Sequence, residues 1–471
     1  MSGSFRAGEE KERPGVYRRH VNAGGSDVAG AAENVGLAVV SGTWGPLNKP
    51  VITEGSDDVA SIIGGGKGAN VITQMRIGGA NTIVVVRVGS GGTQASITLK
   101  DDADADVVTL TTLYPTSRAF TVTIKESLED DTQKMAIIQE GTKDLETVTF
   151  AAGSAEVAGI IAAFTNSAYV KAVKKADGSG KLKTISQSKF TGGTDPTVNT
   201  ETYDAGFEAS EEETWDGVAV DSEEPAVHML LYTFINRKFE EGMYPYACVG
   251  EPKSVAIDTR IQHAAAFNDY KMHYVLNSWV GTDGVVYEGY LAAARIMGMI
   301  IAVASNSTLT HAVITGAASL NESLKNAVIK KALKAGCLVL SLSKSRQVWI
   351  EKAINTLTVL SADQDKGWKK IRRMKTRFEL EDRVDATIEN LGTSLDNDDD
   401  GRATVISAIT DVMDAMVGEK KISPGGTVEL DASNPPKGDS AWFNISPDDI
   451  DSMEIFYLTY RYRFAPEEEE E

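Results

Sequence analysis

The run Gly64–Gly68, with Lys67 inside it, has the composition of a phosphate-binding loop. Such a loop places its Gly-Lys pair before a Ser or Thr that holds the metal, and it directly follows a strand. Here Gly68 comes after Lys67, a helical pattern precedes the run, and the glycine spacing does not match a dinucleotide fingerprint. We therefore predict a flexible break in a helix and no nucleotide site.

The acidic run Asp396–Gly401 resembles the first half of a calcium-binding loop. A complete loop needs a bidentate Glu at its twelfth position, which is Ser407 in this chain. Asp399 and Asp400 also stand where a helix N-terminus favours negative charge. Helix capping is the preferred interpretation, with adventitious cation binding as the alternative.

The remaining residues that could perform catalysis lack the spacing that catalysis requires. No HExxH, CxxC or GxSxG motif is present, and 89 positions separate the two cysteines. The residues concerned are His20, His228, His263, His273, His311, Cys248 and Cys337. We predict no catalytic residues, no metal site, no cofactor and hence no enzyme.

One charged cluster stands out in an otherwise acidic chain. Seven cations and no anion occupy twelve residues, namely Lys366, Lys369, Lys370, Arg372, Arg373, Lys375 and Arg377. Trp368, Ile371, Met374 and Phe378 recur at helical spacing, which predicts a long basic helix that buries one stripe and turns its charges outward. Two interpretations remain open: a surface that binds an acidic protein, or a solvated face.

The composition of the chain excludes several classes of protein. The chain of 471 residues is 42% hydrophobic and 24% charged, which is ordinary for a globular protein of several domains. Its net charge of −20 disfavours nucleic acid and anionic membranes as partners. The first twenty residues do not resemble a signal peptide, and the most apolar run, 296–304, is too short to span a membrane. We expect synthesis in the cytoplasm and no membrane insertion.

The pattern of apolar residues predicts an α/β core interrupted by an all-β insert. Buried strands at Val35–Val40 and 83–88 flank a helix, and core alternation resumes after the insert. Short segments rich in Thr and Val, with one helix near 156–164, fill the insert. The predicted divisions are an arm (1–24), a first core part (25–93), the insert (94–195), a second core part (196–360), a C-terminal domain (361–453) and a final strand with an acidic tail (454–471).

More detailed expectations follow for the second core part and the C-terminal domain. Strands are predicted at 217–220, 246–249, 274–280 and 338–342, with helices near 227–240, 256–270, 288–304 and 322–335. Beyond the basic helix we expect a second helix at 402–417, then loops.

Both ends of the chain have features of strands that pair with other copies. The residues 453–464 alternate in the manner of a strand, and a strand with a free edge is a template for another chain. The candidates for intersubunit pairing are Val16, Tyr17, Val21, Ile455, Tyr457, Thr459 and Arg461. A loose arm and a terminal strand together predict the subunit of a polymer.

Several weak landmarks then occur in a characteristic order. They are Arg13–Tyr17, Val35–Val40 leading to Gly45–Val51, Arg76–Asn81 with Val84–Val88, and Thr191–Asp195. In this order and spacing the chain resembles the contractile tail sheath proteins of bacteriophages and phage-like particles. Unlike the family pattern, this chain ends in the acidic run Glu467–Glu471.

The resemblance implies a multidomain sheath protein with an α/β core, an inserted β-sandwich-like domain and an α+β C-terminal domain. It implies a helical homo-polymer around an inner tail tube, with baseplate and tail terminator proteins as further partners, in a virion tail or phage-like particle. It also implies a C-terminal domain that packs against the tube, and contraction that drives the tube through a target envelope. We predict that the basic cluster makes the contact with the tube. The alternatives are a static surface lattice and, with less support, an α/β enzyme.

Overall fold

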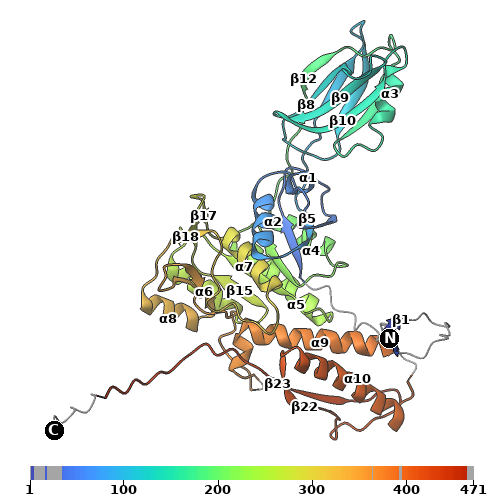
Figure 1. The fold of residues 1–471 in the computed structure, drawn as a ribbon. Coiled ribbons are helices and arrows are strands. Elements are labelled where there is room, and N and C mark those ends of the chain that lie inside the picture. Colours follow the sequence, from blue (N-terminus) through green and yellow to red (C-terminus); the bar gives the residue numbers. More distant parts are fainter. Residues whose placement is uncertain (1, 5–15, 19–33, 363, 392–394, 464–471) are drawn as a thin grey trace. The chain divides into compact units, whose positions relative to one another are not determined.

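A computed structural model describes residues 2–4, 16–18, 34–362, 364–391 and 395–463 of the chain. The chain separates into two compact units. The larger unit is built mainly on residues 34–375 and also takes up the segment from Asp451 onward, whereas the smaller one is built mainly on residues 376–450. Figure 1 shows their helices and strands.

A seven-stranded sheet forms the centre of the larger unit. Its strands, in spatial order, are β19 (Cys337–Leu338), β15 (Met272–Val275), β14 (Tyr246–Gly250), β13 (Gly217–Val220), β3 (Val35–Val40), β5 (Thr82–Arg87) and β4 (Pro50–Thr53). All neighbours are parallel except the edge strand β4. The pairing of β13 with β3 joins residues from before and after the insert into one sheet, which confirms the predicted α/β core.

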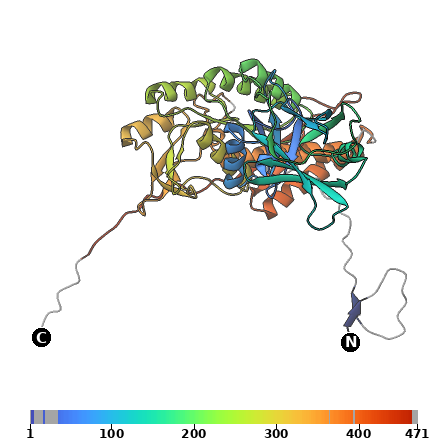
Figure 2. The same ribbon diagram turned by 90° about the horizontal axis from the view of Figure 1, so that it is seen from above.

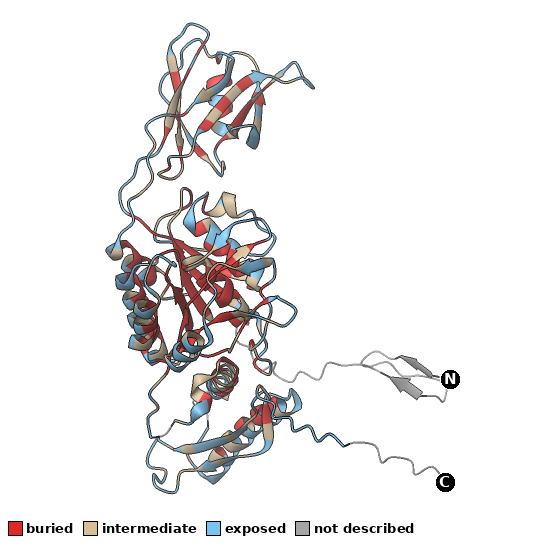
Figure 3. Cartoon of the chain, turned by 90° about the vertical axis from the view of Figure 1, so that its left-hand side faces the viewer, coloured by how far each residue is buried: buried red, intermediate tan, exposed pale blue. Residues whose placement is uncertain are grey.

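Helices cover both faces of this sheet, which explains why its strands are continuously apolar. One face packs on α4 (Thr200–Ala209), α5 (Pro225–Glu240) and α6 (Ile257–Phe267), and the other on α2 (Lys67–Gly78) and α7 (Tyr290–Ala302). Figures 2 and 3 show these layers and the buried strands between them. Two short helices, α1 (Val59–Ile62) and α8 (Asn326–Lys334), complete the unit.

Close contact between α2 and α7 depends on two glycines. A Cβ added at Gly78 would lie 2.4 Å from the carbonyl oxygen of Arg295, and one added at Gly298 would lie 2.1 Å from that of Met75. Only a residue without a side chain lets the two backbones approach this far.

The insert is a β-sandwich of two antiparallel sheets. One sheet contains β6 (Ser96–Lys100), β7 (Asp106–Thr112) and β11 (Val170–Lys174); the other contains β8 (Phe120–Glu126), β9 (Gln133–Glu140), β10 (Lys143–Ala151) and β12 (Ile185–Lys189). The helix α3 (Glu156–Ala163) adds Val157 and Ile160 to the shared core. The alternation of buried and partly exposed residues along β7 and β8 is the pattern expected of half-buried strands.

The loop between β3 and β4 packs between the sandwich and the sheet. Trp44 is 2% exposed, and its ring meets the ring of Phe120 edge to face at 5.2 Å between centroids. The buried guanidinium of Arg87 donates to the carbonyls of Gly42, Gly45 and Pro115 at 2.8–3.0 Å. Burial lowers the pKa of Arg87 to about 10, so it remains charged at neutral pH. Sequence patterns predicted only a loop here.

Two predicted strands of the larger unit are each divided in two. The range 274–280 contains the end of β15 and the start of β16 (Trp279–Gly281), and 338–342 contains the end of β19 and all of β20 (Leu340–Leu342). Asn277 lies at the first break, where its side chain bonds both the N–H and the carbonyl of Leu340. Small sheets with β17 (Val286–Tyr287), β18 (Ala317–Leu320) and β21 (Val348–Ile350) follow.

The smaller unit packs a helix pair against a hairpin. Its elements are α9 (Ile371–Leu391), α10 (Asp399–Gly418), β22 (Ile422–Leu430) and β23 (Phe443–Asp449). Asp398 caps α10 by accepting from the N–H of Gly401 at 2.8 Å, which confirms capping as the role of the acidic run. The expectation of loops after residue 417 was wrong, because Pro424 and two glycines hide the alternation of β22.

Candidate functional site

The carboxyl edge of the central sheet is where an α/β enzyme would place its active site. The order of strands reverses between β3 and β13, and ligands of open α/β sheets bind at such a point. Here Asp221, just after β13, accepts hydrogen bonds from the backbone N–H and the hydroxyl of Ser41, just after β3. The hydroxyl of Tyr203 donates to the other carboxylate oxygen at 2.5 Å. The polar groups at this point thus bind one another.

The glycine-rich run lies beside the same edge and has a structural role there. Gly66 has a φ of +96° and precedes the first turn of α2, so the predicted helix break is confirmed. A Cβ at Gly68 would lie 2.0 Å from the carbonyl oxygen of Ser41, so α2 can pack on the end of β3 only with glycine at this position. The amine of Lys67 lies over the ring of Tyr290 at 5.5 Å.

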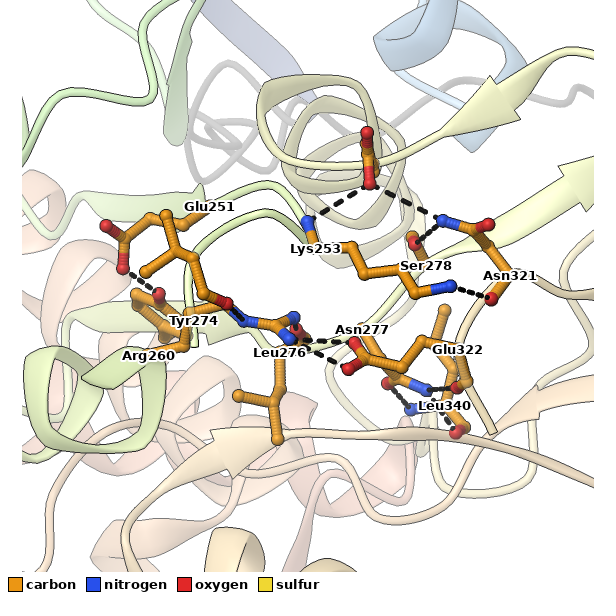
Figure 4. A network of polar contacts seen from close by, with 12 residues as sticks. Glu251, Lys253, Arg260, Tyr274, Leu276, Asn277, Ser278, Asn321, Glu322 and Leu340 are labelled. Carbon is orange, nitrogen blue, oxygen red and sulfur yellow. Dashed lines mark hydrogen bonds and ion pairs between the residues drawn. The ribbon is translucent and has the colours of Figure 1, made fainter. Parts of the chain in front are cut away.

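A buried arginine organises the next part of the edge (Figure 4). Arg260 is 1% exposed, and its guanidinium donates to the carbonyls of Val255 and Leu276 at 2.9 and 2.5 Å. It also binds both carboxylate oxygens of Glu322 at 2.8 and 2.9 Å. Through these contacts Arg260 links α6 to the segment that precedes α8. No sequence motif predicted this arrangement.

We expect the substitution Arg260→Met to lower the free energy of unfolding by about 3–5 kcal/mol, because it leaves the Glu322 carboxylate without its buried partner. Thermal and denaturant unfolding of the purified protein measure this loss. Arg346→Met is the matched control, since Arg346 is exposed and has no carboxylate partner among the described residues. Equal stability of the two variants would contradict a supporting role for Arg260.

The histidines and cysteines within the described ranges are built into the fold. His228 and His273 are buried and bond the carbonyls of Ser222 and Ala247, and His263 bonds Glu251 at 2.8 Å. His311 stacks on Trp349, Cys248 and Cys337 are free and buried, and His20 lies outside the described residues. Burial lowers the pKa of His273 to about 4 and raises that of Cys337 to about 12. In the part of the chain that the structure describes, no group of three or more His, Cys, Asp or Glu could hold a metal ion.

The basic cluster has a different form from the long outward-facing helix that we predicted. Residues Lys366–Lys369 form a short 3₁₀ helix capped by Asp365, Lys370 is extended, and α9 begins only at Ile371. Ile371, Met374 and Phe378 are buried, as their helical spacing indicated. The prediction that all the charges point outward was wrong, because Arg372 is only 9% exposed.

Most of these cations bind groups of their own chain. Lys375 donates to the carbonyls of Ile300, Ile301 and Val303 at 2.6–2.9 Å, where α7 ends. The remaining pairs are Lys369 with the carbonyl of Thr358, Arg372 with Ser452, Arg373 with Asp365 and Arg377 with Asp449. The positive charge therefore stabilises the protomer itself.

Lys370 holds the start of the C-terminal segment. Its amine lies 2.8 Å from a carboxylate oxygen of Asp451 and 3.1 Å from one of Glu454. Although burial favours the neutral amine, the hydrogen bonds that Lys370 donates to these carboxylates raise its pKa. The other oxygen of Glu454 accepts from the hydroxyls of Thr308 and Thr310. We call Lys370, Asp451 and Glu454 the C-terminal clamp.

Beyond the clamp, the segment 455–463 has no strand partner among the described residues of its own chain. Six apolar or aromatic side chains in it are 65–92% exposed: Ile455, Phe456, Tyr457, Leu458, Tyr460 and Tyr462. The predicted strand is thus absent from the single chain, since strands form only against a neighbouring edge. Isolated exposed apolar residues are common, but a continuous run of them marks an interaction surface.

The N-terminal candidates fall partly within the described residues. Val16 and Tyr17 lie in β2 (Val16–Arg18), which pairs in parallel with β1 (Ser2–Ser4). Val21 lies outside the described residues. No helix among the described residues is long and apolar enough to cross a membrane.

Comparisons with known proteins identify the family. Models of the phage tail sheath protein β-sandwich, central and C-terminal domains match residues 90–195, 197–356 and 363–463, respectively. Together they cover most of the sequence. The chain therefore belongs to the phage tail sheath protein family.

Solved sheath structures share the fold of this chain, and one curated relative is similar to it over nearly its whole length. The sheath tail protein of Desulfitobacterium hafniense superposes with a TM-score of 0.72 at 19% identity, over 93% of this chain and 100% of that one. The anti-feeding prophage helical sheath in its contracted state gives 0.54 at 10% identity, over 96% and 100%. An uncharacterized protein of Bacillus subtilis, YqbK, is 22% identical over 97% of this chain and 98% of its own length.

Proposed function

We propose that the protein is the protomer of a contractile tail sheath, which polymerises helically around an inner tube and drives it through a target envelope on contraction. The observation that carries this proposal is the exposed segment 455–463, which follows the C-terminal clamp and has no partner strand among the described residues. Its backbone groups and apolar side chains are free to complete a sheet of a neighbouring copy. The tube, baseplate and tail terminator proteins are the further partners, and a virion tail or phage-like particle is the location.

Pairing between copies would use alternate residues of this segment. Ile455, Tyr457, Thr459 and Arg461 lie on one side of an extended chain, and the intervening residues lie on the other. At the N-terminus, Val16, Tyr17 and Val21 are the proposed pairing residues. On assembly, β2 would then give up its short pairing with β1 and pair with a longer strand at the sheet edge of a neighbouring copy.

The same proposal includes a contact between the basic cluster and the tube. This contact is constrained by the carboxylates of the same chain that already bind three of these cations. Acidic groups of a tube would have to compete with Asp365, Asp449, Asp451 and Glu454 for the cations that these residues bind. The three cations concerned are only 15–19% exposed, so losing a partner would be costly and each carboxylate would have to be replaced by one from the tube. Contraction is then a switch between two packings of the same protomers.

We expect the purified protein to form hollow, striated cylinders without nucleotide or cofactor. Negative-stain electron microscopy at moderate salt and high protein concentration tests this, with sedimentation as the quantitative measure. Flat lattices would favour a static surface layer, and a strictly monomeric species would contradict the proposal.

A further inference from the structure

A groove of about 690 Å³ lies beside the C-terminal clamp, within the larger unit. It is lined by the end of α8, the chain from Lys352 to Leu360, the 3₁₀ helix and residues 452–455. Leu333, Ile354 and Met453 contribute apolar surface to it. The groove therefore adjoins the place where the exposed C-terminal segment leaves the clamp.

The rim of the groove is strongly basic. Five lysines line it, against the single carboxylate of Glu454: Lys334, Lys352, Lys366, Lys369 and Lys370. Lys370 is engaged in the clamp, and Lys369 donates to the carbonyl of Thr358. Among the described residues, no carboxylate lies within ion-pair distance of Lys334, Lys352 or Lys366.

Lys334, Lys352 and Lys366 thus gather three lysines without carboxylate partners around one groove of a protein whose net charge is −20. The same chain contains the matching group, because Glu467–Glu471 place five consecutive carboxylates shortly after the exposed segment. We propose that the basic groove of one protomer binds the acidic run Glu467–Glu471 of a second copy. This inference rests on the proposed polymer and adds a second contact to the strand pairing.

Chain length favours a second copy over the same chain. An extended chain spans at most about 3.3–3.6 Å per residue, so Arg463 can lie about 28 Å beyond Ile455 at the groove. Glu467 and Glu471 can lie at most about 14 and 28 Å from Arg463. With 455–463 extended, as strand pairing requires, a chain that doubles back at Arg463 brings only Glu471 as far as Ile455 and leaves Glu467 at least about 14 Å away. The run as a whole therefore cannot occupy its own groove, which favours the groove of a second copy.

Disulfide trapping between two single-site variants tests the contact. Lys366→Cys and Glu469→Cys proteins are mixed before assembly, inspected for tubes by electron microscopy, oxidised and separated on a non-reducing gel. The native Cys248 and Cys337 are buried and stay silent. We expect a cross-linked heterodimer, with at least a tenfold lower yield for Lys330→Cys, which is exposed on α8 outside the groove.

A charge swap separates specific recognition from chance proximity. Lys334→Glu/Lys352→Glu/Lys366→Glu should make tubes dissociate at a lower salt concentration, and replacement of all five glutamates by lysine in the same chain should restore salt resistance. Tubes in which Lys366→Cys and Lys330→Cys cross-link to Glu469→Cys with equal yield would overturn the groove contact alone. The same conclusion would follow if a Lys366→Cys/Glu469→Cys double variant cross-linked only within one chain. Absence of tubes from the unmodified protein would instead contradict the proposed polymer and this inference with it.

Discussion

Removing residues 455–471 should abolish tube formation and leave the protomer folded. The side chains of Ile455–Tyr462 are largely exposed, so their loss removes few contacts within the chain. We expect an unfolding temperature within a few degrees of the full chain, because substitutions away from packed features change stability by less than about 0.5 kcal/mol. Sedimentation and electron microscopy should show monomers where the full chain gives cylinders.

A pair of proline substitutions tests whether backbone pairing is the cause. Leu458→Pro/Thr459→Pro removes two consecutive N–H donors, which point to opposite edges of a strand, and should also abolish tubes. The matched control Leu458→Ala/Thr459→Ala keeps both donors and should assemble. Normal tubes from the proline variant would show that another surface joins the copies.

Reversing the charge of Lys370 should reduce assembly almost as severely. Lys370→Glu places a third carboxylate beside Asp451 and Glu454, so the start of the C-terminal segment should leave its seat. The segment would then project in many directions, and ordering it on a neighbour would cost additional conformational entropy. We expect at least a tenfold rise in the protein concentration needed for tubes, measured by sedimentation.

A compensating swap distinguishes the clamp from a tube contact. The triple variant Lys370→Glu/Asp451→Lys/Glu454→Lys restores opposite charges within the chain and should recover tube formation. If Lys370 instead acts mainly by binding an acidic tube, the triple variant should assemble alone but fail to form extended particles with the tube protein. Failure of the triple variant in both assays would contradict a role for the clamp in assembly.

Local patterns were enough to predict most elements of the fold. The runs Val35–Val40 and 217–220 were recognised as buried strands, because a parallel strand covered on both faces must be apolar at every position. The sandwich strands and α3 followed from alternation and helical spacing in the same way. The arrangement of landmarks along the chain also pointed to the sheath family, which the domain matches confirm.

Patterns weakened by turn residues were missed. Pro424 and the neighbouring glycines hid the hairpin strand β22, and the break around Asn277 in the predicted strand at 274–280 was not expected. In both cases the strands depend on hydrogen bonds with residues outside the segment itself, which local propensity does not report.

The roles of the charged residues were decided by the tertiary structure. The sequence showed a dense basic cluster and an acidic background, but not that Lys370 would meet Asp451 and Glu454, or that Arg260 would meet Glu322, 62 positions away. Such pairs depend on which segments the fold brings together, because the energy of an ion pair is set by the distance between the charges in space and not by their separation along the chain. The sequence therefore predicted the basic cluster, but only the tertiary structure placed Lys370 in the clamp and most of the other cations against groups of their own chain.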